Sequence, residues 1–423
     1  MTDVVGIVRL LVVLLLIALL VILVTRRLAV PYTLGLVIVG FLIGVVGRFS
    51  TIRFDPALVL FVFLPALLFE GSWSVSIQFL RKNWLMIFLL AVPGVLLELV
   101  LIAVPLHFFT QLDWGDAFLL SAILSPTDPV AVLGLFRQMN VDKDLSTLIE
   151  GESLFNDGIA GALYQVFLAL VLLSVHNQTI SGSQAWLNGL GTFALEAGGG
   201  VLIGGICGLL VSRFVRHIDE PLIETTITLV TAYGVYLLAD ALHTSGILAV
   251  ILAGLILGSY GRNSTMSEKT RETIDNFWSM VAFIANALVF LLVGVQLNPV
   301  AYLSSPKATT FLFIAGLAIA AVLLARFILV VLLPSNVPPA PGKRLHSWRF
   351  LIFWSGLRGA LSMALVLALP LEVPDRATLI FATYAVVLFT LMVQGFSLRL
   401  ILKHLPLLPN VPLPPNVPLP PTP

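Results

Sequence analysis

The sequence predicts an all-α protein that crosses a membrane many times. Hydrophobic residues make up 59% of the 423 residues, charged residues make up 11%, and the mean hydropathy is +1.05. A soluble protein of this length needs much more polar surface. Apolar stretches of about twenty residues, the length that a helix needs to cross the hydrocarbon core, recur along the chain. Two of them contain helix breakers together with ionisable side chains.

Thirteen apolar stretches, separated by short polar breaks, predict about 13 transmembrane helices. The third and the ninth are the shortest, and the loops leave no room for a soluble domain. The stretches are residues 4–24, 29–47, 56–72, 84–108, 115–136, 147–173, 190–211, 222–242, 245–260, 277–297, 309–333, 349–370 and 377–402.

The distribution of Lys and Arg predicts how these helices are oriented. Of the 23 basic residues, 16 fall in loops that follow odd-numbered stretches and 4 in loops that follow even-numbered ones. Cytoplasmic loops retain positive charge during insertion. We therefore expect the N-terminus outside the cell membrane and the C-terminus in the cytoplasm.

Composition also excludes several classes of function. The net charge of +1 gives no electrostatic reason to expect nucleic acid as a partner. The single cysteine, Cys207, rules out a disulfide framework and a thiolate metal site. No phosphate-binding glycine loop occurs, so ion gradients must drive any transport. We expect neither an enzyme nor a bound cofactor.

The fifth stretch is interrupted at Thr127 and Asp128, which lie between Pro126 and Pro129. Each proline removes a backbone donor and disfavours helix at the preceding residue, so an unwound segment is predicted here. Such a segment is tolerated at membrane depth only where it is buried in protein or lines a cavity. The Thr127 hydroxyl, the Asp128 carboxylate and the freed carbonyls are oxygen ligands suited to Na⁺, K⁺ or Li⁺. The alternative is a plain proline kink in which Asp128 compensates a helix end.

The sixth stretch carries four polar residues, Glu152, Ser153, Asn156 and Asp157, at helical spacing. Ser153 and Asp157 are four residues apart and share one face, while Glu152 and Asn156 share the neighbouring face. One face can offer oxygens to an ion while the other makes structural contacts. In the alternative, all four bond to neighbouring helices, as intramembrane Ser and Asn often do.

The twelfth stretch is interrupted by Gly356 and Gly359, which flank Leu357 and Arg358. It comes seven stretches after the fifth, so the two interrupted helices run in opposite directions across the membrane. This layout predicts two inverted repeats whose broken helices cross at the midplane. Arg358 can supply fixed positive charge where the half-helices meet, but a structural salt bridge to Glu152 is the simpler expectation.

Acids outnumber bases among the six ionisable groups that we place well inside these stretches. Each buried charge costs about 3 kcal/mol to insert, so these groups must be paired, protonated or ion-bound. Four acids against two bases leave two excess negative charges, which a bound cation or bound protons can offset; this predicts a cation transporter. Glu70 is either a supporting acid for the ion or a helix end that faces water. The six groups are Glu70, Asp128, Glu152, Asp157, Arg326 and Arg358.

Four motifs are jointly specific: Phe63-Leu64-Pro65, Thr127-Asp128-Pro129, Glu152-Ser153-Leu154-Phe155-Asn156-Asp157 and Gly356-Leu357-Arg358-Gly359. In these motifs the chain resembles the sodium/proton antiporters of the monovalent cation:proton antiporter superfamily. The resemblance extends through residue 402. It is to the branch with an Asn-Asp pair, the prokaryotic type related to the animal exchangers.

The resemblance implies a role for each polar residue. The counterpart of Asp157 binds either the cation or the proton, Asn156 ties the broken helices together, and Glu152 forms a structural ion pair with Arg358. Arg326 matches a further buried arginine of the family. The residues implied to contribute or support ligands are Asp157, Ser153, Thr127 and Asp128 for the cation, with Glu70 in support.

The resemblance also implies a homodimer in which a core domain moves like an elevator against a dimerisation domain. The whole transporter domain would be residues 1–403, followed by a Pro-rich cytoplasmic tail at 404–423. A repeated Asn-Val-Pro-Leu-Pro-Pro sequence predicts an extended, solvated polyproline conformation for this tail, with a docking role as the alternative. The core-type helices would be 84–173 and 309–402, and the dimerisation-type helices 1–72 and 190–297.

We therefore expect a secondary active sodium/proton antiporter with alternating access. Cation and proton would compete at Asp157, because burial and the neighbouring acids Asp128 and Glu70 disfavour its bare negative charge. The resemblance to the Asn-Asp branch implies electroneutral one-for-one exchange, and Asn156 in place of a second acid gives a physical reason, since one fewer titrating site means one fewer proton to exchange. The alternatives are a potassium/proton antiporter, with Li⁺ as a further possible cation, and, from another class, a cation channel.

Overall fold

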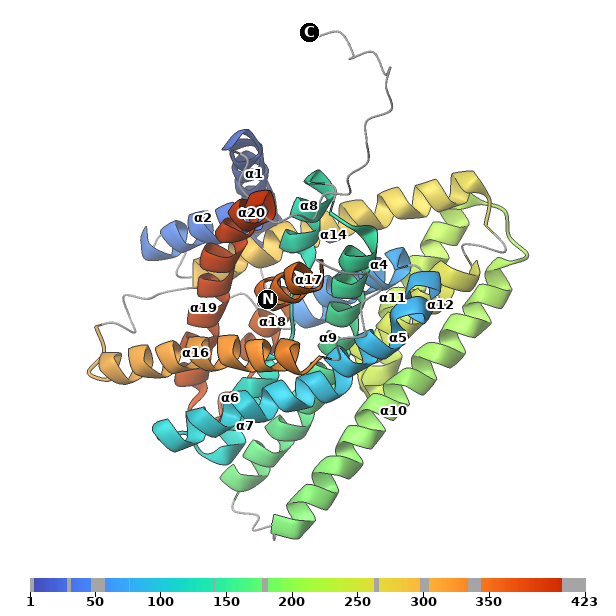
Figure 1. Ribbon diagram of the computed structural model, residues 1–423. Helices are drawn as coiled ribbons and strands as arrows, with labels where there is room; N and C mark the ends of the chain where they lie inside the picture. Colours follow the sequence, from blue (N-terminus) through green and yellow to red (C-terminus); the bar gives the residue numbers. More distant parts are fainter. Residues whose placement is uncertain are drawn as a thin grey trace.

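The computed structural model describes residues 4–28, 32–46, 58–75, 77–139, 141–176, 182–261, 266–296, 304–333 and 344–404. Within these residues the regular elements are helices, and no strand occurs (Figure 1). Residues 405–423 lie outside this description, and so does the polyproline conformation predicted for them.

The first half of the chain forms a long series of helices. These are α1 (Val4–Leu28), α2 (Tyr32–Val46), the π-helical η1 (Val59–Phe63), α4 (Leu64–Ser74), α5 (Ile77–Leu89), η2 (Leu90–Gly94), α6 (Val95–Phe109), α7 (Trp114–Leu124), α8 (Val130–Gln138), α9 (Lys143–Val175) and α10 (Gly182–Val215).

The second half continues in the same way. Its elements are α11 (Pro221–Ala241), α12 (Gly246–Ile256), η3 (Leu257–Gly261), α14 (Glu268–Gln296), α16 (Ala308–Leu332), α17 (Arg344–Trp354), α18 (Ala360–Leu367), α19 (Arg376–Phe389), η4 (Thr390–Gln394) and α20 (Gly395–His404).

Each of the thirteen predicted stretches overlaps a helix or a pair of half-helices. Seven helices in the described residues are long and apolar enough to cross a membrane, and four further apolar helices are shorter. Two of the predicted stretches are split into half-helices by the prolines and glycines noted above. The prediction of a polytopic all-α membrane protein is confirmed, while the number thirteen stays a prediction. The seven long helices are Leu80–Phe109, Lys143–Val175, Gly189–Val215, Pro221–Ala241, Glu268–Leu292, Ala308–Leu332 and Arg376–His404.

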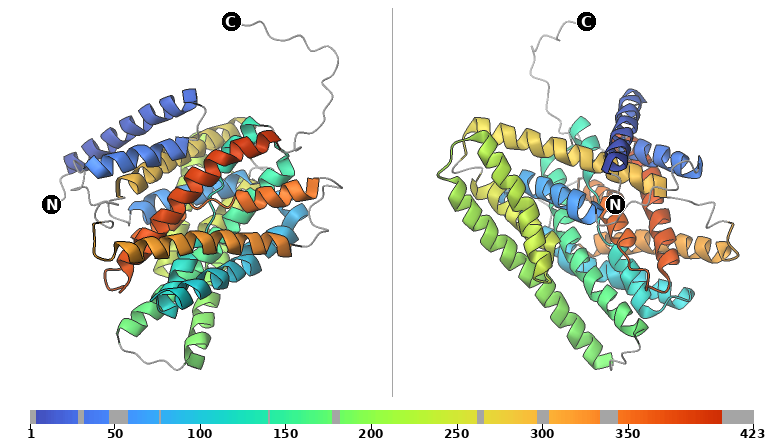
Figure 2. Two further views of the ribbon diagram at one scale, coloured as in Figure 1. Left: turned by 60° about the vertical axis from the view of Figure 1, so that its left-hand side comes forward. Right: turned by 180° about the vertical axis from the view of Figure 1, so that it is seen from behind.

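Apolar side chains cover much of the outer surface, as a lipid environment requires. α10 lies along one edge of the bundle (Figures 1 and 2). Its side chains Leu202, Leu209 and Leu210 are all more than half exposed. α1 lies on the other side of the bundle and exposes Leu16 and Leu20 in the same way. Contiguous apolar surface of this extent is unfavourable in water and is covered by acyl chains in a bilayer.

The helix contacts fall mainly into two groups, which are joined by α9, since α9 also packs on α10 and α12. α2 packs on α14, and α12 packs on α4, α10 and α11; in the other group α16 packs on α6 and α19, and α7 packs on α6 and α9. Glycines allow the closest approach, because a Cβ on Gly40 of α2 or on Gly294 of α14 would overlap the backbone of the partner helix. The two groups correspond in sequence to the predicted dimerisation-type and core-type helices, and their separate roles stay a prediction.

Both predicted helix breaks are present, and they contact each other. The chain is unwound at residues 125–129, between α7 and α8, and at 355–359, between α17 and α18. The backbone N–H of Asp128 in the first break donates to the carbonyl of Leu357 in the second, at 2.7 Å. A Cβ on Gly359 would overlap the Asp128 side chain, so only glycine fits at this crossing. The inverted-repeat relation between the two segments stays a prediction.

Candidate ion-binding site

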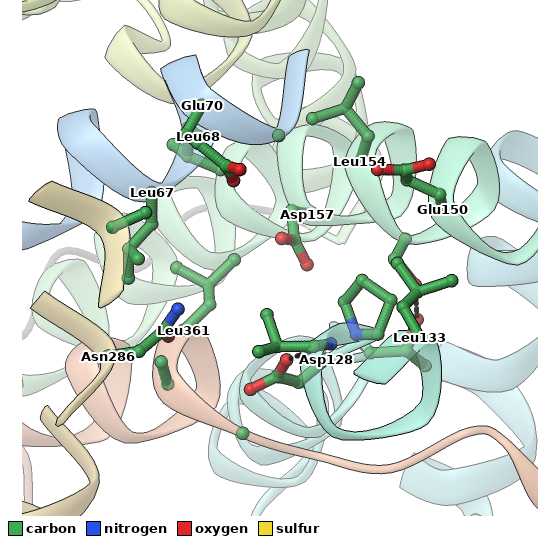
Figure 3. Close-up of a pocket in the computed structure, with 18 of the residues that line it drawn as sticks. Leu67, Leu68, Glu70, Asp128, Leu133, Glu150, Leu154, Asp157, Asn286 and Leu361 are labelled. Carbon is green, nitrogen blue, oxygen red and sulfur yellow. Dashed lines mark hydrogen bonds between the residues drawn. The ribbon is translucent and has the colours of Figure 1, made fainter. Parts of the chain in front are cut away.

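A cavity of about 340 Å³ lies where the 125–129 break faces α9 (Figure 3). Asp157 lies at its centre in this view, with Asp128 of the break on one side and Glu70 of α4 on the other. α14 contributes Asn286 to the wall, and Leu361 near the start of α18 also lines it. The two breaks, α4, α9 and α14 thus enclose one site.

The lining of this cavity is negatively charged. Four carboxylates line it, from Glu70, Asp128, Glu150 and Asp157, and none of the described lining residues is Lys, Arg or His. A cleft lined by one sign of charge between low-dielectric walls concentrates ions of the opposite sign. The cavity is therefore built to attract cations.

α9 holds the first break in place through its polar face. The Asn156 amide donates to Thr127 Oγ1 at 2.7 Å and accepts from the Thr127 backbone N–H at 3.4 Å. Thr127 Oγ1 and Ser153 Oγ lie 2.9 Å apart and share a hydrogen bond. Asn156 and Ser153 are both 2% exposed. The break is therefore fixed by side chains one helix turn apart on α9.

Two carboxylate oxygens at the centre of the site have no hydrogen-bond partner among the described residues. They are Asp128 Oδ2 and Asp157 Oδ1. The other oxygen of Asp128 accepts from the Val130 N–H at 2.9 Å, so this side chain also caps the first turn of α8. The helix-end contact expected in the alternative for Asp128 is therefore present, while its role as an ion ligand stays a prediction. An unsatisfied buried carboxylate oxygen is costly, and a bound cation or proton would relieve that cost.

The available ligands are mixed oxygens. No cluster of three His, Cys, Asp or Glu side chains that could hold a metal ion occurs in the part of the chain described. The residues expected to bind the cation offer two carboxylates, Asp157 and Asp128, beside the hydroxyls of Thr127 and Ser153. Glu70 lies in the same cavity wall, and its role as a supporting acid stays a prediction. Carboxylate and hydroxyl oxygens are the hard ligands that replace the water shell of a monovalent cation.

The structure corrects the expected ion pair between Glu152 and Arg358. Both carboxylate oxygens of Glu152 instead accept from Arg326 of α16, with Arg326 Nη2 at 2.9 Å from Oε2. Arg358 pairs with Glu98 of α6, Nη2 to Oε2 at 3.0 Å. The apolar stretches of the sequence indicate that these groups are buried. They do not indicate which arginine pairs with which acid. α16 packs against α6 and brings Arg326 between Glu98 and Glu152.

Glu98 is the residue that sequence reasoning missed. No motif surrounds it in the sequence, yet it is 2% exposed and lies far from both ends of the continuous helix Leu80–Phe109. The central position of this acid in an apolar stretch was the sequence feature that could have identified it as buried. Glu98 is thus a buried acid beyond those expected, and Glu98 and Glu152 balance the two arginines. The four carboxylates that line the cavity, from Glu70, Asp128, Glu150 and Asp157, do not belong to this balanced set.

The two arginines also satisfy the free carbonyls at the helix breaks. Arg358 Nη1 donates to the carbonyl of Ser125 at 2.9 Å and to that of Pro126 at 3.4 Å. Arg326 donates through Nε and Nη2 to the carbonyl of Ile352, at 3.3 and 3.1 Å. Helix C-terminal carbonyls without partners are costly at membrane depth, and guanidinium groups supply the donors here.

Glu150 and Asn286 are further cavity residues that the motifs did not indicate. Glu150 precedes Ser153 by three residues and Asp157 by seven, so the three lie along one face of α9. Its carboxylate accepts from the Ser74 hydroxyl at 3.2 Å. The helical spacing was enough to find Glu150, whereas Asn286 could be placed only by the packing of α14.

Comparison with known proteins gives consistent matches over most of the chain. The family model described as "Sodium/hydrogen exchanger, transmembrane" matches residues 13–404. The low-affinity Na⁺/H⁺ antiporter NhaS1 of Synechocystis sp. is 39% identical over 384 residues, covering 90% of this chain and 70% of the relative. The Na⁺/H⁺ antiporter NhaH of Halobacillus aidingensis is 34% identical over 403 residues, covering 93% of this chain and 96% of the relative.

A solved structure has the same fold. The sodium proton antiporter MjNhaP1 of Methanocaldococcus jannaschii, determined at pH 8, superposes with a TM-score of 0.73 at 18% identity, covering 94% of this chain and 98% of its own. This likeness concerns the arrangement of the helices alone.

Proposed function

Because the chain belongs to the sodium/hydrogen exchanger family, we propose that it exchanges sodium ions for protons across a cell membrane by secondary active transport. The observation that carries this proposal is the pair of unsatisfied oxygens, Asp128 Oδ2 and Asp157 Oδ1, in a cavity lined by acids. The hydroxyls of Thr127 and Ser153 lie in the same cavity. Such a site binds one cation or accepts a proton, and the two exclude each other.

The Asn156-Asp157 pair supports electroneutral one-for-one exchange. Asn156 occupies the position where a second acid would add a titrating group, and its amide is engaged with Thr127. Glu98 and Glu152 are balanced by Arg326 and Arg358, so their charges do not take part in the exchange. Asp157 then alternates between sodium and proton as the site opens to each side.

We place the N-terminus outside and the C-terminus in the cytoplasm, on the evidence of the basic residues. The two packing groups of helices support a core domain that moves against a dimerisation domain in a homodimer. Na⁺ is favoured over K⁺ because the relatives described above are named Na⁺/H⁺ antiporters.

The test is Asp157→Asn, assayed in everted membrane vesicles with a pH-sensitive dye. Addition of Na⁺ to vesicles with the unaltered chain should dissipate the pH gradient, and the variant should show no Na⁺-dependent signal. The matched control is Asp240→Asn on α11, an exposed acid outside the cavity, which should behave like the unaltered chain. Full exchange by Asp157→Asn would refute the proposal, and uncoupled Na⁺ flux without proton counter-flow would indicate a channel.

A further inference from the structure

A buried chain of four charges connects α9 to the second helix break. In order it contains Glu152, Arg326, Glu98 and Arg358, and we refer to it as the charge chain. Each member is at most 4% exposed. Two acids and two bases make it neutral, so every charge in it depends on its neighbour for compensation.

Glu98 is the link that joins the two arginines. Its Oε1 lies 3.5 Å from Arg326 Nη1, and its Oε2 lies 3.0 Å from Arg358 Nη2. Arg326 has a second acid, Glu152, whereas Glu98 is the ion-pair partner of Arg358 in the described residues. Neutralising Glu98 therefore leaves the Arg358 charge without a counterion.

The position of Arg358 makes its charge balance relevant to the ion site. Its guanidinium bonds the carbonyls of Ser125 and Pro126, directly before Thr127 and Asp128. It also lies within electrostatic range of Asp157. An uncompensated positive charge at this place in a low-dielectric interior disfavours any cation bound nearby.

We propose that Glu98 is a positioning residue of the transport cycle, which holds Arg358 on the first break and offsets its charge so that the site retains its affinity for cations. This inference rests on the proposed function, since it takes the carboxylates of the 125–129 break and α9 as the cation site. Glu98 belongs to α6, which does not line the cavity, so a helix outside the site would control its affinity for cations.

Glu98→Gln preserves the shape of the side chain and removes its charge. The apparent Km for Na⁺ at alkaline pH should rise about tenfold, because the excess positive charge opposes cation binding. Proton binding is weakened for the same reason, so the acid limb of the activity profile should move to lower pH. A purely structural role would lower the amount of folded protein and leave Km and the pH profile unchanged.

The experiment uses the full chain, purified in detergent and reconstituted in proteoliposomes. Exchange is measured over a range of Na⁺, K⁺ and pH, and the cation concentration that gives half of the maximal thermal stabilisation is measured in detergent. The second measurement reports binding without transport. The matched control is Glu224→Gln, because Glu224 is a fully buried acid of α11 that lies outside the cavity and accepts from Thr270.

A raised Km and a raised stabilisation midpoint in Glu98→Gln, with unaltered values in the control, support the proposal. Unaltered values in Glu98→Gln overturn it. If Glu98→Gln does not accumulate, Glu98→Asp is measured instead. Its shorter side chain keeps the charge but withdraws it from Arg358, so cation affinity should fall, though less than expected for Glu98→Gln. An affinity equal to that of the unaltered chain would overturn the proposal. Absence of exchange in the unaltered chain would instead contradict the proposed function, and the thermal midpoints would still decide the role of Glu98.

Discussion

At the scale of the residue, the site combines fixed oxygens with exchangeable ones. The hydroxyls of Thr127 and Ser153 bond each other, and Asn156 holds Thr127 from a second direction. Asp157 and Asp128 keep one oxygen each without a partner in the described residues. A pre-organised set of ligands lowers the entropic cost of binding, while the unsatisfied oxygens supply the affinity. The hydroxyls should therefore affect cation affinity more than protein stability.

Ser153→Ala tests this division directly. It removes one candidate ligand and the hydrogen bond to Thr127. The apparent Km for Na⁺ in proteoliposomes should rise about tenfold, which corresponds to the free energy that a hydrogen bond to a charged group contributes. Ser174→Ala on the same helix is the control, because Ser174 is exposed and donates to the carbonyl of Val171. An unaltered Km in Ser153→Ala would remove this hydroxyl from the site.

At the scale of the element, the two helix breaks were predictable and the contacts between distant helices were not. Pro126, Pro129, Gly356 and Gly359 act on the backbone locally, so their effect can be deduced from sequence alone. The partner of a buried charge depends on which helices meet, and for this reason the pairing of Glu152 with Arg326 was missed. Glu98 was missed because it stands alone in an apolar helix, without a motif around it.

The crossing of the breaks gives a prediction for Gly359. A methyl group at this position would overlap Asp128, so Gly359→Ala must displace that carboxylate or open the crossing. Na⁺-dependent exchange should fall at least about tenfold even where the protein still folds. Gly316→Ala on α16 is the matched control, since the added methyl group would meet no atom within 4 Å apart from the nearby backbone of its own helix, and alanine favours helix. Equal exchange by both variants would show that the crossing tolerates a side chain.

At the scale of the whole molecule, the fold separates the paired charges of the interior from the acids that line the cavity. The charge chain neutralises itself between α6, α9, α16 and the second break. Four further carboxylates line one cavity, where α4 and α14 face α9 and the first break. Relative movement of the two packing groups of helices would expose the cavity to each side in turn. Such a molecule needs no further energy source than the two ion gradients.

The central claim is that sodium and a proton share Asp157 in turn. The most direct test is the apparent Km for Na⁺ in proteoliposomes, measured over a range of pH with the membrane potential clamped at several values. Competition for one site predicts that, in the acid range, Km rises about tenfold for each unit by which the pH falls, because one proton displaces one cation. The exchange rate should not depend on the membrane potential. A Km that does not change with pH, or a rate that follows the potential, would contradict the account.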